Sequence, residues 1–273
     1  MNVSEMLLVS DMDGTLLTTD KRISDQNQAA LKRFQAAGGR FTIATGRSIV
    51  SASRYVNALR EKGIKLDAPA ILFNGAAIYD FRQDQMLWHT RMPEELPAYL
   101  ARVKAQFPEV GIEVLYEEKT KVVTHNRFVR DHLEIESLPY QMADIKDLVP
   151  GAIKTLFALE HEKIPCFARF LEEQHFTGVS YVESAEFYYE MLPFGNSKGE
   201  ALSHLAQYAK VSLDQIAAVG DYNNDIEMIR TAGLGAAMGN ALDAVKNAAD
   251  RTVSTNDQDG LAELIEYMMN RCA

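Results

Sequence analysis

The chain has 273 residues, of which 47% are hydrophobic and 24% charged, proportions typical of globular proteins rather than of disordered or fibrous ones. Its formal net charge of −10 disfavours nucleic acid as a partner, because phosphate backbones bind basic faces. No apolar run approaches the roughly 20 residues of a membrane-spanning helix, and the first ten residues lack the pattern of a signal peptide. We therefore expect no membrane partner and a cytoplasmic location.

The first part of the chain alternates apolar runs with amphipathic segments. Strands are predicted at 6–10, 41–45 and 70–73, from short apolar runs that end in turn residues. Helices are predicted between them at 24–37 and 48–63, each with a serine at its start and a glycine behind or at its end. This alternation is typical of a parallel sheet with right-handed crossovers.

A hairpin signal follows the third predicted strand. Asn74-Gly75 favours a tight turn, and the apolar run 76–79 is a candidate partner strand. After about residue 81, strands follow one another without a helix between each pair, which predicts an antiparallel sheet with helices on one face. The strands of this middle region are predicted at 110–116, 121–125, 152–159, 179–182 and 187–191, and its helices at 93–107 and 164–174.

The two cysteines and one polar group of the middle region carry further expectations. Cys166 lies in an apolar helical segment, and we expect it in the hydrophobic core. Cys166 and Cys272 are far apart and indicate neither a disulfide framework nor a zinc site. The polar group of His125, Asn126 and Arg127 is expected to form a solvated turn, with a position facing a cleft as the alternative.

From residue 197 the alternation of helix and strand returns. Helices are predicted at 197–209, 225–232, 242–249 and 260–269, and strands at 216–220 and 234–238. We therefore predict an α/β fold with a Rossmann-like parallel sheet core flanked by helices, built from residues 1–81 and 192–273. Residues 82–191 are predicted to form an inserted α+β cap domain.

Four polar clusters stand where elements of the predicted parallel core begin or end. Taken alone, each is as well explained by a loop, a helix cap or a turn. The clusters are Asp11 and Asp13 with Gly14-Thr15, then Thr45-Gly46-Arg47, then Ser197-Lys198-Gly199, and finally Gly220-Asp221 with Asn224-Asp225. Because open α/β sheets place their ligand sites at the carboxyl ends of strands, the clusters are expected to converge.

Together the clusters fit phosphoryl transfer, which needs a nucleophile, an acid/base, a divalent cation and donors to the phosphoryl oxygens. Asp11 is a candidate nucleophile, because carboxylates can form an aspartyl-phosphate. Asp13 is a candidate for protonating the leaving oxygen and later activating water. Asp221 and Asp225 would add acidic oxygen ligands, which suit Mg²⁺ rather than zinc.

Two further side chains complete this hypothesis. Thr45 offers a hydroxyl donor, and Lys198 offers a cation that also reduces the repulsion among the carboxylates. An acidic protein that binds an anionic substrate needs such a local positive charge.

These motifs resemble those of the haloacid dehalogenase-like phosphatase superfamily. The resemblance rests on Asp11-Met12-Asp13-Gly14-Thr15, on Thr45, on Lys198 and on Gly220-Asp221 with Asn224-Asp225. Four local matches resemble the Cof-type branch, which carries a large α+β cap of type C2 between the second and third motifs. They are Ala44-Thr45-Gly46-Arg47, Asn74-Gly75-Ala76, Pro193-x-Gly195-x-Ser197-Lys198-Gly199 and Ala237-Met238-Gly239-Asn240-Ala241.

The resemblance implies a role for each matching residue. The implied catalytic residues are Asp11, Asp13, Thr45 and Lys198. The implied phosphoryl-binding or substrate-binding residues are Thr45, Gly46, Arg47, Asn74, Lys198 and Asn224. The implied Mg²⁺ ligands are Asp11, Asp13 through its backbone carbonyl, Asp221 and Asp225. The resemblance also implies a class of reaction, because an acid at the position of Asp13 is typical of the phosphatases and mutases of the superfamily.

The resulting hypothesis is a Mg²⁺-dependent phosphatase that hydrolyses phosphate monoesters of small metabolites through an aspartyl-phosphate. Sugar phosphates are the favoured class, and pyridoxal phosphate, flavin mononucleotide and nucleotides stay open. One alternative is a phosphomutase, although mutases of the superfamily usually carry a smaller helical cap. Another is a non-catalytic sugar-phosphate sensor, although no presumed catalytic group is missing. We expect the cap to choose the substrate and the chain to be a monomer or a weak homodimer.

Overall fold

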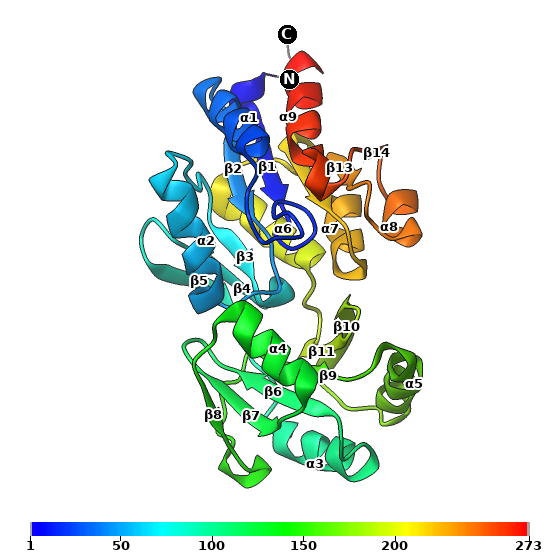
Figure 1. The fold of residues 1–273 in the computed structure, drawn as a ribbon. Coiled ribbons are helices and arrows are strands. Elements are labelled where there is room, and N and C mark those ends of the chain that lie inside the picture. Colours follow the sequence, from blue (N-terminus) through cyan, green and yellow to red (C-terminus); the bar gives the residue numbers. More distant parts are fainter. Residues whose placement is uncertain (1, 272–273) are drawn as a thin grey trace. The chain divides into compact units, whose positions relative to one another are not determined.

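The computed structural model describes residues 2–271, which form two compact units (Figure 1). The first unit comprises the chain up to Gly46, Ser53–Trp88 and the chain from Ser197 onward. The second unit comprises Arg47–Ala52 and His89–Asn196. The domain boundaries expected from the sequence, at 81/82 and 191/192, stay a prediction of where the domains separate.

The first unit is built on a five-stranded parallel sheet. Its strand order is β14 (Arg251–Thr252), β13 (Leu234–Ala237), β12 (Ile216–Gly220), β1 (Leu7–Ser10) and β2 (Arg40–Ile43). The central strand β1 is buried along its whole length and pairs in parallel with β12 and β2. A run of buried apolar residues is what a parallel sheet covered on both faces requires. The predicted α/β core is therefore confirmed.

Helices flank this sheet. They are α1 (Asp25–Ala36), α2 (Ile49–Glu61), α6 (Lys198–Ala209), α7 (Ile226–Thr231), α8 (Asp243–Ala248) and α9 (Gly260–Arg271). Helices α1 and α9 lie side by side, although they come from opposite ends of the chain (Figure 1). Leu7 and Val9 of β1 pack with Leu202 and Leu205 of α6 and with Met228 of α7.

A small antiparallel sheet departs from the expected pattern. It consists of β3 (Ala70–Leu72), β4 (Ala77–Asp80) and β5 (Gln85–His89), and the predicted hairpin at Asn74-Gly75 joins its first two strands. The expectation that 70–73 extends the parallel sheet holds in part, because a parallel bridge between Ala44 and Ile71 joins β3 to the end of β2. The tight turn folds the chain back, so that β3 forms its antiparallel ladder with β4.

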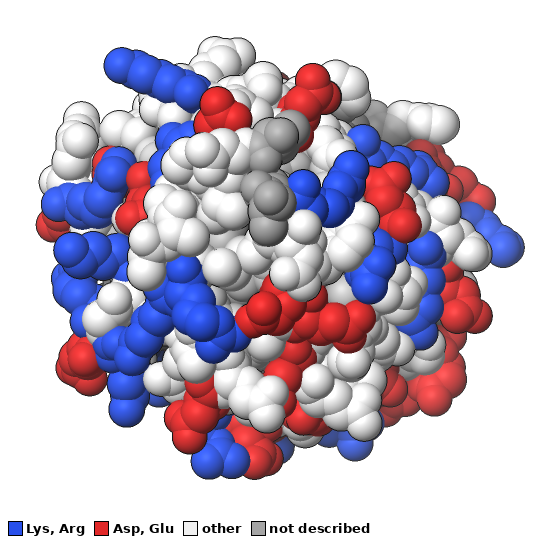
Figure 2. All heavy atoms as spheres, turned by 90° about the horizontal axis from the view of Figure 1, so that it is seen from above, with Lys and Arg blue, Asp and Glu red and all other residues white. Residues whose placement is uncertain are grey.

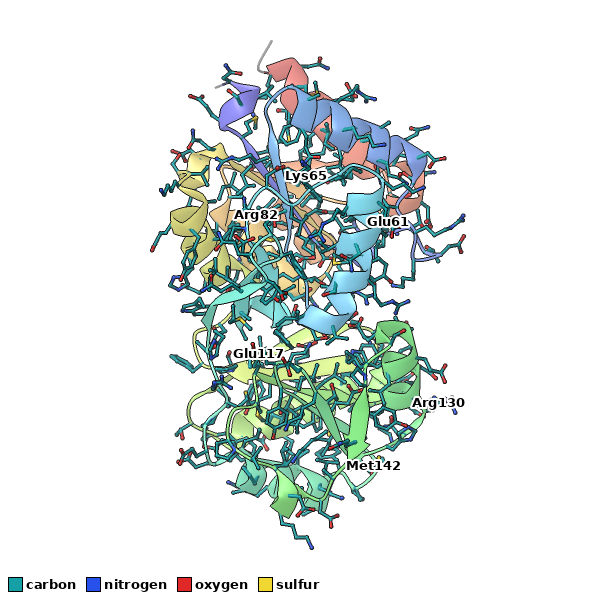
Figure 3. All side chains as sticks on the ribbon, turned by 90° about the vertical axis from the view of Figure 1, so that its left-hand side faces the viewer. Glu61, Lys65, Arg82, Glu117, Arg130 and Met142 are labelled. Carbon is teal, nitrogen blue, oxygen red and sulfur yellow. The ribbon has the colours of Figure 1, made fainter. Side chains whose placement is uncertain are left out.

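Arg82, in the turn that follows β4, anchors the hairpin within the first unit. Arg82, labelled in Figure 3, pairs with the carboxylate of Asp80 and donates to the carbonyl oxygen of Asp67 at 3.0 Å. The second of these contacts connects the turn after β4 to the loop that leads into β3. The strand β5, which the sequence analysis did not predict, follows this anchored turn.

The second unit contains a six-stranded sheet. Its order is β10 (Val179–Ala185), β11 (Tyr188–Pro193), β9 (Lys154–Ala158), β6 (Gly111–Leu115), β7 (Thr120–Thr124) and β8 (Tyr140–Met142). All neighbours are antiparallel except β7 and β8. This confirms the predicted antiparallel sheet in the insert. The short strand β8, which was not predicted, forms an exposed edge that carries Met142 (Figure 3).

The helices of the second unit pack on both faces of its sheet, so the expectation of helices on one face is wrong. Residues of α3 (Leu96–Gln106) and α5 (Ile164–Glu173) form one hydrophobic core with alternate strand residues such as Val114 and Phe157. Successive strand side chains point to opposite faces. Glu113 therefore lies on the other face, where His132 of α4 (Arg127–Glu136) contacts it.

Two further expectations for the second unit need correction. His125 and Arg127 are exposed, as expected for a solvated turn, but the side chain of Asn126 caps α4 by accepting from the amide of Val129 at 3.0 Å. Cys166 is exposed, because α5 turns Ile164 and Phe167 into the core and Cys166 to the opposite side. Cys272 lies outside the described residues.

Lys and Arg side chains are interspersed with Asp and Glu on the face shown in Figure 2, so the excess of acidic residues does not form a uniform field there. Among residues 2–271, no helix combines the length and the apolar character needed to cross a membrane.

Candidate active site

Three neighbouring parallel strands deliver the predicted polar residues to one edge of the first unit. Asp11 follows β1, Thr45 lies just beyond the end of β2, and Asp221 follows β12. Because these strands are adjacent and parallel, their carboxyl ends meet, and that edge is where open α/β sheets bind ligands. The predicted convergence of these three clusters is observed.

Lys198 is the first residue of α6 and links two acids. Its ammonium donates to Asp11 Oδ1 at 2.6 Å and to Asp225 Oδ1 at 2.7 Å, and its side chain is only 1% exposed. Burial alone would lower the pKa of Lys198, but the charges of Asp11 and Asp225 outweigh it and raise that pKa. The lysine therefore stays charged.

The hairpin turn helps to place Lys198. Gly75 has a φ of +97°, and a Cβ atom there would lie 2.1 Å from the carbonyl oxygen of Ser197. Glycine is therefore required at this position both for its backbone conformation and for the close approach of α6. Ser197 in turn caps α6, because its hydroxyl accepts from the amide of Glu200 at 3.1 Å.

Three carboxylates form a cluster around this lysine. One oxygen each of Asp11, Asp221 and Asp225 lies within 4.8 Å of the others. Burial, together with the charges of Asp225 and Asp221, raises the pKa of Asp11 well above its usual value, although Lys198 acts in the opposite direction. Burial and the charge of Asp225 raise the pKa of Asp221 to about 7. A cation would relieve this repulsion, and the donors are the oxygens that hard divalent cations prefer.

Two neighbours shape the carboxylate cluster. A Cβ atom on Gly14 would lie 2.4 Å from Asp221 Oδ2, so only glycine leaves room for that carboxylate. Thr15, which sequence reasoning did not assign to the site, donates from its hydroxyl to Asp221 Oδ1 at 2.7 Å. Its place directly behind the Asp-x-Asp-Gly motif was the available signal. The residues present therefore fit a bound divalent cation.

Asp225 also fixes the loop that carries Asp221. Its Oδ2 atom accepts from the backbone amides of Asp221 at 2.9 Å and of Tyr222 at 3.2 Å. The carboxylate is fully buried, and its Oδ1 atom accepts from Lys198. One oxygen therefore organises the loop and the other holds Lys198. Both tasks depend on its charge.

Asp13 lies outside the cluster formed by the other three carboxylates. Its Oδ1 atom accepts from the ammonium of Lys21 at 2.7 Å, and the Asp13 side chain is 37% exposed. A carboxyl group in contact with solvent can exchange a proton readily, which suits a general acid/base. Sequence reasoning did not identify Lys21.

The two predicted asparagines meet beside Thr45. Asn224 Nδ2 donates to Asn74 Oδ1 at 2.9 Å, and the amide of Asn74 donates to the Thr45 carbonyl at 3.1 Å. Gly46 lies against the Asn74 side chain. Within residues 2–271, the buried Oδ1 atom of Asn224 has no hydrogen-bond partner. Thr45, Gly46, Asn74 and Asn224 thus lie together in one polar group, and their role in binding a substrate stays a prediction.

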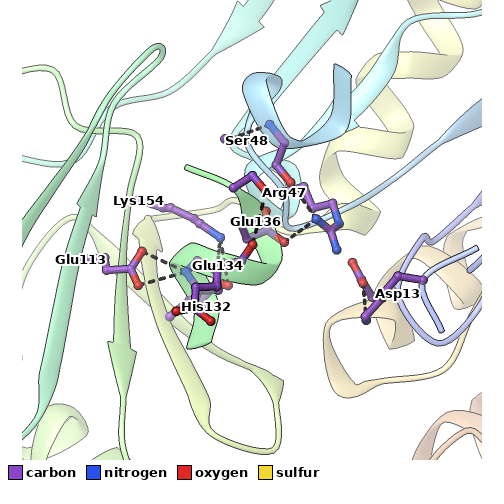
Figure 4. Close-up of polar contacts among 12 residues, drawn as sticks. Asp13, Arg47, Ser48, Glu113, His132, Glu134, Glu136 and Lys154 are labelled. Atoms are coloured by element: carbon purple, nitrogen blue, oxygen red, sulfur yellow. Dashed lines mark hydrogen bonds and ion pairs between the residues drawn. The ribbon is translucent and has the colours of Figure 1, made fainter. Parts of the chain in front are cut away.

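Arg47 groups with the second unit. Its guanidinium pairs with Glu136 at 2.6 Å (Figure 4) and donates to the hydroxyl of Ser51 at 2.7 Å. The side chains of Arg47 and Glu136 are buried. The expected role of Arg47 as a second anion contact stays a prediction. Its pairing with Glu136 was not foreseen.

The second unit contains further buried charges that sequence reasoning missed. His132 Nδ1 lies 2.9 Å from Glu113 Oε2, and Lys154 donates to both carboxylate oxygens of Glu190 at 3.0 Å (Figure 4 shows the first pair). The sequence signal for these pairs was a charged residue inside each of three predicted strands, namely Glu113, Lys154 and Glu190. Ser184 also donates to Glu190, at 2.8 Å.

The buried lysine between two carboxylates and the acid pair after the first strand are the features from which the sequence analysis expects a haloacid dehalogenase-like hydrolase. The sequence matches the family of haloacid dehalogenase-like hydrolases over residues 8–265. The chain belongs to this family, and the predictions of the superfamily and of an enzyme are confirmed.

Named relatives are similar over nearly the full chain. The 5-amino-6-(5-phospho-D-ribitylamino)uracil phosphatase YitU of Bacillus subtilis is 28% identical over 270 residues, covering 97% of this chain and 98% of the relative. The pyridoxal phosphate phosphatase YbhA of Escherichia coli is 30% identical, covering 95% and 97%.

Solved structures share the fold. A haloacid dehalogenase-like hydrolase from Bacteroides thetaiotaomicron is 28% identical with a TM-score of 0.82, covering 96% of this chain and 99% of that one. The subclass IIB sugar phosphatase BT4131 has a TM-score of 0.84 at 21% identity, covering 96% and 98%, and this likeness concerns the fold alone.

Proposed function

We propose that the protein is a Mg²⁺-dependent phosphatase that hydrolyses phosphate monoesters of small metabolites. The observation that carries the proposal is the buried ammonium of Lys198 between Asp11 and Asp225, with the half-exposed Asp13 two residues beyond Asp11. The relatives YitU and YbhA are named as phosphatases of small phosphorylated compounds, which supports the same reaction class here.

The proposed reaction has two steps. A carboxylate oxygen of Asp11 attacks phosphorus, the ester P–O bond breaks, and Asp13 gives its proton to the leaving oxygen. Asp13 then takes a proton from water, which attacks the phosphorus of the aspartyl-phosphate and releases inorganic phosphate and the free Asp11 carboxylate. Lys198 holds Asp11 in place and adds positive charge where phosphoryl oxygens gather.

The cation would be held by Asp11, Asp221 and Asp225 together with the backbone carbonyl of Asp13. When bound, Mg²⁺ would neutralise charge on the phosphoryl oxygens and relieve the repulsion that raises the pKa values of Asp11 and Asp221. The oxygen-only donor set supports Mg²⁺ over zinc.

The polar group of Thr45, Gly46, Asn74 and Asn224 is proposed to bind the phosphoryl oxygens. Hydroxyl, amide and backbone donors at a strand end suit an anion. Asn224 holds Asn74 in place at 2.9 Å, so a change in either residue is expected to disturb both.

The second unit is proposed to choose the substrate, with sugar phosphates favoured and pyridoxal phosphate, flavin mononucleotide and nucleotides as further candidates. Its buried pairs Glu113–His132 and Lys154–Glu190 support this. Buried ion pairs contribute little net stability compared with apolar residues of similar size. Their presence therefore favours a task other than folding. A cytoplasmic location and a monomeric or weakly dimeric state stay predictions.

The test is phosphate release from a panel of phosphorylated metabolites with Mg²⁺ and with EDTA, for the wild type and Asp11→Asn. We expect Mg²⁺-dependent release by the wild type and loss of turnover in Asp11→Asn. The matched control is Asp20→Asn, which removes an exposed acid from the neighbouring loop. Full activity of Asp11→Asn would exclude the nucleophile assigned here.

The same panel separates the alternatives. A phosphomutase would interconvert isomers in the presence of a sugar bisphosphate instead of releasing phosphate. A sensor would bind members of the panel without turning them over. The assembled contacts of Asp11, Lys198 and Asp225 argue against the sensor, because clustered buried carboxylates are unfavourable unless a function retains them.

A further inference from the structure

The side chain of Lys21 lies directly beside the carboxylate assigned to proton transfer. Its Nζ atom is 2.7 Å from Asp13 Oδ1, and the two side chains are 42% and 37% exposed. An ion pair so open to water contributes little to stability. The pair is therefore not explained by folding, and both side chains are accessible from solvent.

The turn that carries Lys21 is closed by backbone hydrogen bonds. The amide of Thr18 donates to the carbonyl of Arg22, and the amide of Lys21 donates to the carbonyl of Thr18, both at 2.8 Å. Lys21 itself has a φ of +58°. This left-handed conformation is unfavourable for a lysine, and glycine or asparagine would adopt it at lower cost.

The same turn is anchored on both sides within the first unit. The amide and hydroxyl of Thr19 donate to the Asp257 carboxylate at 2.8 and 2.7 Å. Asn256 donates to the carbonyl of Leu17 at 2.9 Å, and Asn240 donates to the carbonyl of Gly14 at 2.8 Å. Segments distant in sequence thus fix the loop at the position that brings Lys21 to Asp13.

The ammonium of Lys21 pairs with Asp13, whereas the buried acids Asp11 and Asp225 pair with Lys198. Asp13 lies outside the cluster of Asp11, Asp221 and Asp225. In the proposed reaction Asp13 reaches the ester oxygen of the leaving group. An ammonium in contact with Asp13 therefore lies within a few ångströms of the atoms next to that oxygen.

We propose that Lys21 is a specificity-determining residue that binds a second anionic group, a carboxylate or a phosphate, on the leaving group of the substrate. This inference rests on the proposed function. It narrows the substrate class to phosphate monoesters that carry another negative charge close to the ester oxygen. A net charge of −10 on the protein makes a local cation essential for such a ligand.

The first experiment compares kcat/KM for matched substrates with and without the second anion. The carboxylate arm uses 2-phosphoglycolate and the phosphate arm uses ethylene glycol bisphosphate, each compared with 2-hydroxyethyl phosphate. In Lys21→Gln we expect the preference for the anionic member to fall about 10- to 100-fold, the range for a lost hydrogen bond to a charged group. Lys21→Arg should keep the preference.

Arg22→Gln is the matched control, because it removes one positive charge from the adjacent exposed residue. The arm in which the preference falls identifies the anion as carboxylate or phosphate. Equal losses for both members of each pair would overturn the proposal, because Lys21 would then act only through Asp13. A wild type without preference for either anionic member would overturn it as well.

A binding measurement keeps this test independent of turnover. Titration calorimetry with 2-phosphoglycolate and with ethylene glycol bisphosphate is carried out on Asp11→Asn, with and without Lys21→Gln. We expect the second change to raise Kd about 10-fold or more for at least one ligand. An unchanged Kd for both would reject the role of Lys21, whereas absence of phosphate release by the wild type would reject the proposed function instead.

Discussion

Lys198 and Asp11 are 187 positions apart in the sequence, and the ammonium of one lies 2.6 Å from the carboxylate of the other. The contact forms because β1 ends at the edge of the sheet where α6 begins, with the whole second unit inserted between them in the sequence. The chemistry therefore depends on how the first unit reassembles from both ends of the chain.

Replacing Lys198 by Met should abolish activity and destabilise the protein. Asp11 and Asp225 would stay buried without their cation, a change that typically costs about 3–5 kcal/mol. Urea unfolding and phosphate release measure the two effects. Lys32→Met, which removes an exposed lysine of α1, should leave both nearly unchanged. Normal stability of Lys198→Met would show that the two acids do not need this partner.

Mg²⁺ should stabilise the folded protein, because the carboxylate cluster exists only in the folded state. A ligand present at 100 times its Kd contributes about 2.7 kcal/mol, which thermal unfolding detects as a higher Tm. Asp221→Asn should lose most of this effect. Burial and Asp225 raise the pKa of Asp221 to about 7, so its charged carboxylate is disfavoured in the folded state. Without Mg²⁺ and above pH 7, Asp221→Asn should therefore be at least as stable as the wild type. The exposed Asp243→Asn is the control. An equal Mg²⁺ response in both variants would contradict the assigned ligands.

The contacts at the sheet edge were predictable for a physical reason. Asp11, Thr45 and Asp221 each follow an apolar strand, and parallel strands bring their carboxyl ends together. Lys198 was predictable because a serine cap marks the start of its helix. In these cases a local pattern and a general topological rule were sufficient.

Other features depend on tertiary packing and had no such local signal. The strand β3 fits a parallel sheet by its apolar run, but the turn at Asn74-Gly75 directs its pairing to β4. Glu113 and His132 are 19 positions apart on a strand and a helix, and only the packing of α4 on the sheet joins them. The contact of Lys21 with Asp13 requires the anchors from Asn240, Asn256 and Asp257.

His132 should make stability depend on pH. Burial alone would lower the pKa of His132, but Glu113 and Glu136 reverse this and raise it, with Lys154 acting against them. A raised pKa in the folded state means that the stabilisation is fully present below about pH 6.5, the value of unperturbed histidine, and is lost as pH rises through the folded-state pKa.

Urea unfolding between pH 5.5 and 8.5, at about half-unit steps, tests this dependence. The wild type should lose stability towards high pH, and His132→Gln should flatten the profile. His125→Gln, which changes an exposed histidine of the same unit, should follow the wild type. A profile of His132→Gln that parallels the wild type would assign the pH dependence to other groups.

Single and double variants of the pair Lys154 and Glu190 distinguish an effect on stability from an effect on substrate recognition. Lys154→Met leaves Glu190 buried without its cation and should cost about 3–5 kcal/mol, whereas replacing both residues by Met should be nearly neutral or stabilising. If the second unit chooses the substrate through this pair, the double variant should fold normally and lose kcat/KM for its best substrate. Unfolding in urea and phosphate release on the same preparations measure both. A stable double variant with unaltered substrate preference would show that this pair has no part in recognition.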